Sequence, residues 1–170
     1  MIALVESEQT SELADLYRAQ YRSLVRMASL LLGDVALSEE VVQDAFVQLH
    51  HNWRRVIDPS KREAYLRSIV LNIARSRSRR RTLGRRLEIV RPAGDAESAE
   101  AGAMRGADRD DVMRALRALP DRQRECLVLR YYLDLSERAI ADTLGISAGS
   151  VKTHTSRAMA ALTRALEPTR

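Results

Sequence analysis

Polar and basic side chains near the C-terminus have the types and spacing needed to read a DNA major groove. Residues 147–157 read Ser-Ala-Gly-Ser-Val-Lys-Thr-His-Thr-Ser-Arg, and a helical period places Val151, Ala158 and Leu162 on an apolar inner face. The residues left on the outer face are Ser150, Lys152, Thr153, His154, Ser156 and Arg157. Short side chains at a helix N-terminus let the backbone approach phosphate, and longer polar ones reach base edges. An ordinary solvated surface helix is the competing interpretation.

The residues before this helix predict the first half of a helix-turn-helix. Leu135-Ser136 and Ile146-Ser147 each place an apolar residue before a serine N-cap, with Ile140 and Val151 at the fourth helical position, as in a hydrophobic staple. Gly145 stands where a left-handed residue ends the first helix. Two short helices with a tight glycine turn form this motif, although such hairpins also occur in proteins that bind no DNA. Upstream, an apolar period over 112–119 predicts a helix closed by Pro120, which can open the next helix and lead to about Tyr132.

Three helices are predicted in the N-terminal half. An apolar stripe from Leu13 to Leu31 indicates one long helix that Gly33 stops. A second helix buries apolar residues between 41 and 49, and Asp58-Pro59 then interrupts the chain because the residue before proline avoids helical angles. The second helix leaves outward the acid and amide side chains Glu40, Gln43, Asp44 and Gln48. The third helix has a core stripe over 66–73 and a polar face of Ser68, Asn72, Arg75 and Arg79, spaced four, three and four residues apart.

Composition and charge divide the chain into two helical modules. The 170 residues are 45% apolar and 30% charged, with only seven Gly and four Pro, which favours an all-α protein of one domain or two small ones. Residues 75–91 hold eight arginines and one acid, whereas 92–111 hold six acids and two arginines among small residues. We therefore expect a three- or four-helix bundle over 1–82, a flexible acidic linker over 83–109 and a four-helix module over 110–170. The net charge of +5 suits a polyanionic partner.

Several classes of activity are excluded by what the sequence lacks. The single cysteine, Cys126, excludes an intrachain disulfide, fits a reducing cytoplasm and has no His or acid at nucleophile spacing. His50 and His51 are adjacent and so about 100° apart on a helix, unlike a zinc pair. No glycine-rich phosphate loop occurs, and the longest apolar stretches are too short to span a membrane. We therefore expect no catalytic residues, metal site or cofactor, no enzymatic activity, no membrane insertion and a cytoplasmic location.

Short motifs along nearly the full length resemble those of extracytoplasmic function (ECF, group IV) sigma factors of bacterial RNA polymerase, close to the actinobacterial SigE-like branch. The matching strings are 16–18 with Tyr21, 31–34, 41–46, 64–67 with Asn72 and 74–76, 118–120, 122–124, 128–132, 135–137, 140–141, 144–147 and 149–152. The resemblance implies sigma region 2 in the N-terminal module and region 4 in the C-terminal one. It implies a subunit that directs core polymerase to promoters and promotes DNA opening.

The resemblance also implies where the partners bind. The outward face of Glu40, Gln43, Asp44 and Gln48 matches the region 2.2 surface that docks on the β′ clamp helices. The alternative interpretation of these residues is a solvated helix face. The β flap is a second expected contact of the sigma factor with core polymerase. An anti-sigma factor is a further candidate partner. The outer face of the C-terminal helix matches the −35 element reader.

The segment from Trp53 to Asn72 resembles the regions that capture the melted −10 element. Basic grooves and aromatic stacking hold single strands, each stacked base contributing about 1–3 kcal/mol. We expect Trp53, Tyr65, Asn72, Arg75 and Arg79 at this site, although either aromatic ring also suits a protein core. The loop 56–62 is expected to shape the base pocket, and the arginine run after Asn72 to neutralise phosphates with a strong salt dependence.

The expected linker limits how the two modules reach a promoter. Its 27 residues span roughly 30 Å as a free coil and at most about 90–97 Å when extended, whereas the two elements lie roughly 70 Å apart. We therefore expect a free protein that is compact or mobile between modules, with weak promoter affinity. The alternative function is a helix-turn-helix regulator of the LuxR type whose N-terminal half senses a signal or dimerises. A second alternative is an adaptor that acts through proteins alone.

Overall fold

Seven α-helices and two short 3-10 turns make up the described part of the chain. The structure is a computed structural model and describes residues 2–87 and 103–167, in which no strand occurs. The elements are α1 (Ile2–Leu32), α2 (Val35–Asn52), η1 (Trp53–Arg55), η2 (Pro59–Lys61), α3 (Arg62–Leu87), α4 (Ala103–Ala118), α5 (Asp121–Tyr131), α6 (Glu137–Leu144) and α7 (Ala148–Leu166). The all-α prediction is confirmed.

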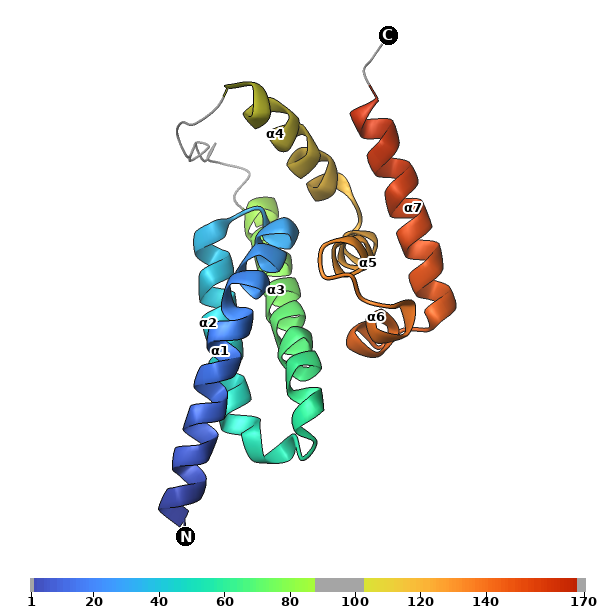
Figure 1. Cartoon of the computed structure of the whole chain (residues 1–170). Helices are drawn as coiled ribbons and strands as arrows, with labels where there is room; N and C mark the ends of the chain where they lie inside the picture. Colours follow the sequence, from blue (N-terminus) through green and yellow to red (C-terminus); the bar gives the residue numbers. More distant parts are fainter. Residues whose placement is uncertain (1, 88–102, 168–170) are drawn as a thin grey trace.

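Helices α1, α2 and α3 form the N-terminal bundle (Figure 1). Gly33 ends α1 with a φ of 69°, a left-handed conformation that costs glycine little. The next residue, Asp34, caps α2 by accepting a 3.0 Å hydrogen bond from the Leu37 N–H. The reversal between the two helices therefore takes only two residues. Asp58 caps η2 in the same way through the Ser60 N–H at 3.0 Å, which positions the start of α3.

Helices α4 to α7 form the C-terminal module, and its caps are those the sequence predicts. The Ser136 Oγ accepts from the Ala139 N–H at 3.1 Å, and the Ser147 Oγ accepts from the Ser150 N–H at 3.1 Å. Gly145 lies between them in the left-handed conformation, with a φ of 66°. The helix-turn-helix prediction is thus confirmed in its local geometry. Pro120 differs in detail: its ψ of 143° is extended, so it is the N-cap and not the first residue of α5.

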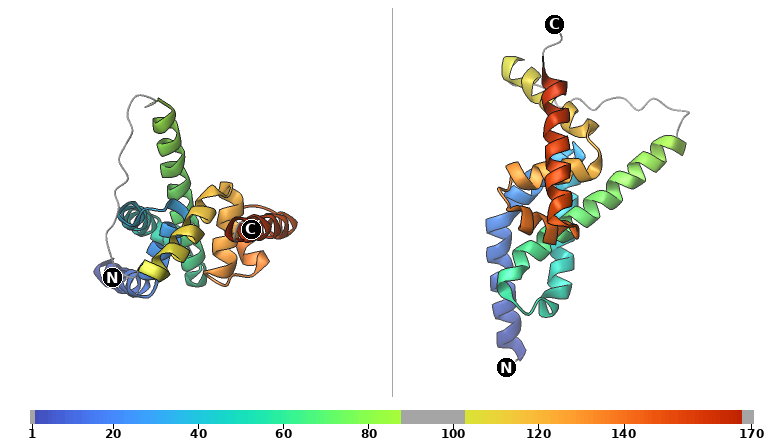
Figure 2. Two further views of the ribbon diagram at one scale, coloured as in Figure 1. Left: turned by 90° about the horizontal axis from the view of Figure 1, so that it is seen from above. Right: turned by 90° about the vertical axis from the view of Figure 1, so that its right-hand side faces the viewer.

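The two modules pack against each other. α1 contacts α4 and α5, and α3 contacts α6, so the C-terminal module lies along one side of the bundle (Figures 1 and 2). One apolar cluster joins buried residues of both modules, including Leu24 and Leu66 from the bundle and Cys126, Leu129 and Ile140 from the C-terminal module. The two modules thus share part of their apolar core.

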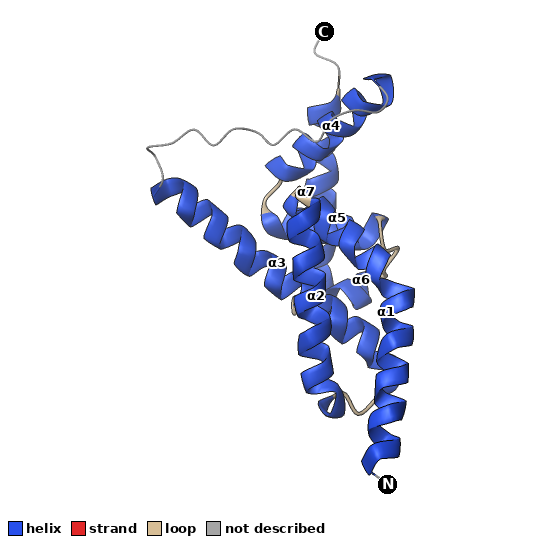
Figure 3. Cartoon of the chain, turned by 90° about the vertical axis from the view of Figure 1, so that its left-hand side faces the viewer, coloured by secondary structure: helices blue, strands red, loops and turns tan. Residues whose placement is uncertain are grey.

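Both ends of the expected linker are helical. α3 continues to Leu87, and α4 begins at Ala103. The charge pattern predicted a flexible linker over the whole range from Leu83 to Arg109. Arginine has a good helix propensity, so the charged end of α3 stays helical after its apolar stripe ends. This end of α3 projects away from the rest of the molecule (Figures 2 and 3). The middle of the expected linker, with Asp95, Glu97 and Glu100, lies outside the described residues.

None of the helices within residues 2–87 and 103–167 combines the length and the apolar character that crossing a bilayer requires.

Candidate polymerase and promoter interfaces

The N-cap of α7 and its buried inner face together orient the helix so that its outer face is exposed to solvent. Val151 and Ala158 are fully buried, which fixes the rotation of the helix. The residues that this rotation leaves exposed are Lys152, Thr153, Ser156 and Arg157, which we call the recognition face. Two predicted members are only half-exposed. The Ser150 Oγ lies 2.8 Å from the Ser147 Oγ, and the His154 Nδ1 is enclosed with no hydrogen-bond partner among the described residues.

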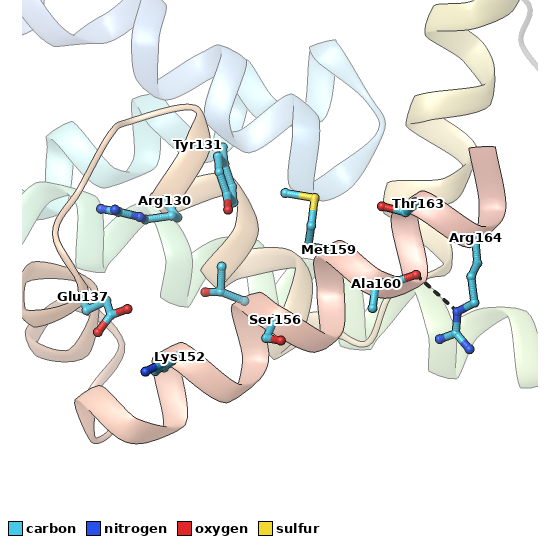
Figure 4. A pocket seen from close by; sticks show the side chains of 10 residues that line it. Arg130, Tyr131, Glu137, Lys152, Ser156, Met159, Ala160, Thr163 and Arg164 are labelled. Atoms are coloured by element: carbon cyan, nitrogen blue, oxygen red, sulfur yellow. Dashed lines mark hydrogen bonds between the residues drawn. The ribbon is translucent and has the colours of Figure 1, made fainter. Parts of the chain in front are cut away.

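A broad hollow of about 950 Å³ lies beside the recognition face and adds residues that the sequence analysis missed (Figure 4). Lys152 and Ser156 line it together with Arg130 and Tyr131 from the end of α5. The Arg130 Nη1 donates to the Leu135 carbonyl at 2.8 Å, and Tyr131 is 63% exposed. The sequence signal that could have identified Arg130 and Tyr131 is a basic and an aromatic residue shortly before the predicted helix-turn-helix. Their place beside Lys152 extends the polar surface beyond α7, and the acidic side chain of Glu137 also lines the hollow.

The polar face of α3 carries most of the predicted single-strand site. Tyr65, Asn72 and Arg79 are exposed, whereas Arg75 is half-buried. The Arg75 Nη1 donates to the Asn72 Oδ1 at 3.0 Å. We call Tyr65, Ser68, Asn72, Arg75 and Arg79 the α3 polar face.

Trp53 is not on this surface, and its expected place there is corrected. The residue is only 5% exposed and belongs to the apolar core. The guanidinium carbon of Arg62 lies 4.1 Å from the centroid of its ring and covers it. An indole buried in this way has no face on which a base can stack, so Tyr65 is the aromatic side chain left at the site.

The arginines of α3 divide between two sides of the helix. Arg77 and Arg81 turn toward α2, where Arg77 pairs with Asp44 at 3.2 Å and Arg81 pairs with Asp34 at 3.3 Å. Arg79 and Arg80 are exposed and have no ion-pair partner among the described residues. Among the side chains of α3 that the structure describes, Arg79 and Arg80 are therefore available to phosphates without the loss of an ion pair.

The outward face of α2 has the exposure that a docking surface requires. Val41, Ala45 and Leu49 are buried on the opposite side. The exposed side chains are Glu40, Gln43, Asp44, Val47 and Gln48, which we call the α2 docking face. Val47 is 56% exposed and completes the stripe, although the sequence analysis did not include it. An exposed valine between an acid and an amide gives the face an apolar centre.

Comparisons with known proteins match this arrangement at both ends of the chain. Residues 16–83 match the family Sigma-70 region 2, and residues 109–162 match the family Sigma-70, region 4. The RNA polymerase sigma-E factor of Streptomyces avermitilis is 31% identical over 156 residues, which cover 92% of this chain and 86% of that protein. The ECF RNA polymerase sigma factor SigM of Mycobacterium tuberculosis is 31% identical over 89% of this chain and 75% of that protein.

Solved structures share the fold. The sigma factor RpoE of Bartonella quintana, crystallised with the anti-sigma factor NepR, has a TM-score of 0.71 at 24% identity and covers 92% of this chain and 99% of that one. CnrH in complex with the cytosolic domain of CnrY has a TM-score of 0.66 at 25% identity, covering 91% and 87%.

The N-terminal half separates the two candidate functions. A regulator of the LuxR type needs a sensing or dimerisation half there, whereas residues 16–83 match sigma region 2. Because a relative at 31% identity also extends over nine-tenths of the chain, both modules have the same family assignment. The chain belongs to the ECF family of RNA polymerase sigma factors.

Proposed function

We propose that this sigma factor binds core RNA polymerase through α2, the melted −10 element through α3 and the −35 element through α7. The observation that carries the proposal is the order of the two sigma regions, each with an exposed polar helix face. Residues 1–82 and 110–170 are the two functional domains in this proposal. The chain acts as a specificity subunit of the polymerase, without a catalytic site of its own, in the cytoplasm.

The −35 element is read by the recognition face of α7. Lys152 and Arg157 supply the positive charge for phosphates and base acceptors, while Thr153 and Ser156 are short enough to let the helix enter the groove. The N-terminus of α7 points its free N–H groups at a phosphate. Arg130 and Tyr131 extend this contact from the neighbouring helix.

The −10 element is captured as a single strand by the α3 polar face. The Asn72 amide can pair with a base edge, and Tyr65 offers a partly exposed ring for stacking. Arg75, Arg79 and Arg80 supply phosphate contacts, which makes binding strongly salt-dependent. The loop 56–61 lies next to Tyr65 and shapes the base pocket.

Core polymerase is bound by the α2 docking face, with the β′ clamp helices as the partner; region 4 in turn contacts the β flap. An anti-sigma factor is a further partner in this proposal. Its support is that the solved structures of RpoE and CnrH are complexes, with the anti-sigma factor NepR and with the cytosolic domain of CnrY respectively.

The proposal is tested by in vitro transcription with purified core enzyme on fragmented genomic DNA, reading the RNA start sites. We expect a defined set of starts that core enzyme alone does not give. Asn72→Ala should change the preferred downstream element, whereas Lys152→Ala with Arg157→Ala should weaken selection of the upstream element. Arg114→Ala, which removes an exposed cation paired with Asp111 on α4, is the matched control. Absence of any specific start with folded protein would refute the proposal.

A further inference from the structure

The α3 polar face is in contact with the C-terminal module. The Ser68 Oγ lies 3.4 Å from the Thr143 carbonyl of α6. A hollow of about 760 Å³ separates the loop at Val56 and Ile57, with Tyr65, from Ala139 and Thr143 of α6. The part of α3 assigned to the −10 strand thus lies partly against α6 of region 4.

One ion pair joins the two modules at this contact. The Arg75 Nε donates to one carboxylate oxygen of Glu125 at 2.5 Å, and the Arg75 Nη2 donates to the other at 3.0 Å. The two side chains are only 16% and 5% exposed. Arg122 adds a third contact to the same carboxylate at 3.2 Å. A forked arginine–carboxylate pair has the geometry with which arginine also binds phosphate.

The same arginine reaches the residue assigned to base recognition. The Arg75 Nη1 donates to the Asn72 Oδ1, so the Asn72 oxygen is engaged by a guanidinium that Glu125 holds in place. Glu125 thus fixes both a phosphate-binding group and the orientation of a base-reading amide from fifty residues further along the chain.

We propose that region 4 closes over the promoter surface of region 2 in the free protein, and that the Glu125 carboxylate occupies Arg75 in place of a DNA phosphate. The inference rests on the proposed function of α3. Single-stranded DNA and Glu125 then compete for one guanidinium, and the strand binds only the fraction of molecules in which the modules have separated. Binding to a minor open state lowers the apparent affinity by the population of that state.

Removing Glu125 opens the molecule because the docked arrangement then buries an unpaired cation. Breaking one side of a buried ion pair leaves the other charge without compensation. Arg75 escapes that penalty by returning to water when the modules separate. The opened chain also offers Arg75 to phosphate, so opening and DNA binding increase together.

The test compares Glu125→Gln with Asp121→Asn in the full chain. Asp121 lies one turn earlier on α5 and pairs with Arg124 of the same helix, so its change removes an acid without touching α3. Small-angle scattering should give a larger radius of gyration for Glu125→Gln only. A fluorescein-labelled single-stranded DNA oligonucleotide should bind Glu125→Gln about fivefold or more tightly than wild type, the lower end of typical coupling between two equilibria. Circular dichroism confirms that each variant is helical.

A charge exchange provides the second arm. Arg75→Glu should open the chain, and Arg75→Glu with Glu125→Arg should restore the wild-type radius, while DNA binding stays weak in both. An unchanged radius in Glu125→Gln and Arg75→Glu, or opening without tighter DNA binding in Glu125→Gln, overturns the inference. Transcription by the wild-type protein tests the proposed function separately. If the variants do not open, the inference fails even where the wild-type protein initiates RNA, and if the wild-type protein initiates no RNA, the proposed function fails.

Discussion

The guanidinium of Arg62 lies 4.1 Å from the centre of the Trp53 ring and also donates to the Glu12 carboxylate at 2.5 Å. The three residues come from the start of α3, from η1 and from α1, so one cation joins three segments of the bundle. A cation over an aromatic face is stabilising, and more so where water is excluded. Arg62 therefore closes the core at the point where the loop to α3 begins.

Replacing Arg62 with alanine should destabilise the bundle by about 1–2 kcal/mol, because the cation–π contact and the Glu12 pair are both lost. Trp53 is the single tryptophan of the chain, so its emission should shift to longer wavelength as water reaches the ring. Urea unfolding followed by this fluorescence measures both effects. Arg18→Ala, which removes a surface cation paired with Asp15 on the same helix, should change neither.

The turn of the helix-turn-helix gives a pair of changes with opposite signs. Gly145→Ala should lower the free energy of unfolding by about 1–2 kcal/mol, because alanine is strained at a φ of 66° although no atom lies within 4 Å of the added Cβ. Gly149→Ala should raise stability by up to about 1 kcal/mol, because Gly149 is in a helix and an added Cβ meets only the Ser147 Oγ at 3.9 Å. Thermal unfolding of the two variants compares them directly. Two changes of equal sign would contradict this account of the turn.

Local features were predicted from the sequence because the residues that make them are neighbours in the chain. Ser136, Gly145 and Ser147 determine caps and a turn within three residues of themselves, and the structure has each of them as expected. Trp53 was predicted at the single-strand site, but its ring is covered by Arg62. The sequence pattern does not show this contact, because it depends on how the Asp58-Pro59 turn places the start of α3.

Contacts between the modules had no local signal. Arg75 and Glu125 are fifty residues apart, and the arginine is one of eight in its stretch, so no spacing marks it as the one that is paired. Val47 was missed for a related reason. It is apolar among acids and amides, and only the rotation of α2 against the core shows that it lies on the docking face.

Val47→Arg should weaken binding to core polymerase without unfolding the bundle, because the change places a charge at the apolar centre of the α2 docking face. Val35→Arg is the matched control, since Val35 is 62% exposed at the opposite end of the same helix. Both variants should keep the wild-type circular dichroism. Gel filtration of each protein with core enzyme compares the amounts of complex. Equal complex formation by the two would remove Val47 from the interface.

The recognition face should account for a measurable share of the salt dependence of DNA binding. Lys152→Ala should reduce the slope of log K against log salt concentration by about 1, because one phosphate contact releases about one counterion. Arg114→Ala should leave the slope unchanged, since Arg114 lies on α4, outside the recognition face. The measurement uses holoenzyme on a duplex promoter fragment at several salt concentrations. Equal slopes for wild type and Lys152→Ala would show that Lys152 makes no phosphate contact.

Cys126 provides a pH-dependent prediction about the core. Burial raises the pKa of its thiol from 9.0 to about 11, with a smaller contribution from the Glu125 charge. The folded protein therefore keeps the thiol protonated at a pH where the unfolded chain begins to lose its proton. A thiol reagent such as dithionitrobenzoate should react slowly with native protein at about pH 8 and rapidly in urea, because the thiolate is the nucleophile.

The same shift determines the sign of the stability change. Below about pH 9 the Cys126 thiol is protonated in both the folded and the unfolded state, so it contributes no pH dependence to stability. Between about pH 9 and 11 the thiol ionises only in the unfolded state, so the free energy of unfolding falls as pH rises. The loss approaches about 2–3 kcal/mol at the upper end, since each pKa unit corresponds to about 1.4 kcal/mol. Cys126→Ala should lack this part of the slope, and the titration of other groups cancels in the difference between the two proteins. Parallel curves for wild type and Cys126→Ala would mean that the thiol ionises equally well in the folded core, which burial at this position does not allow.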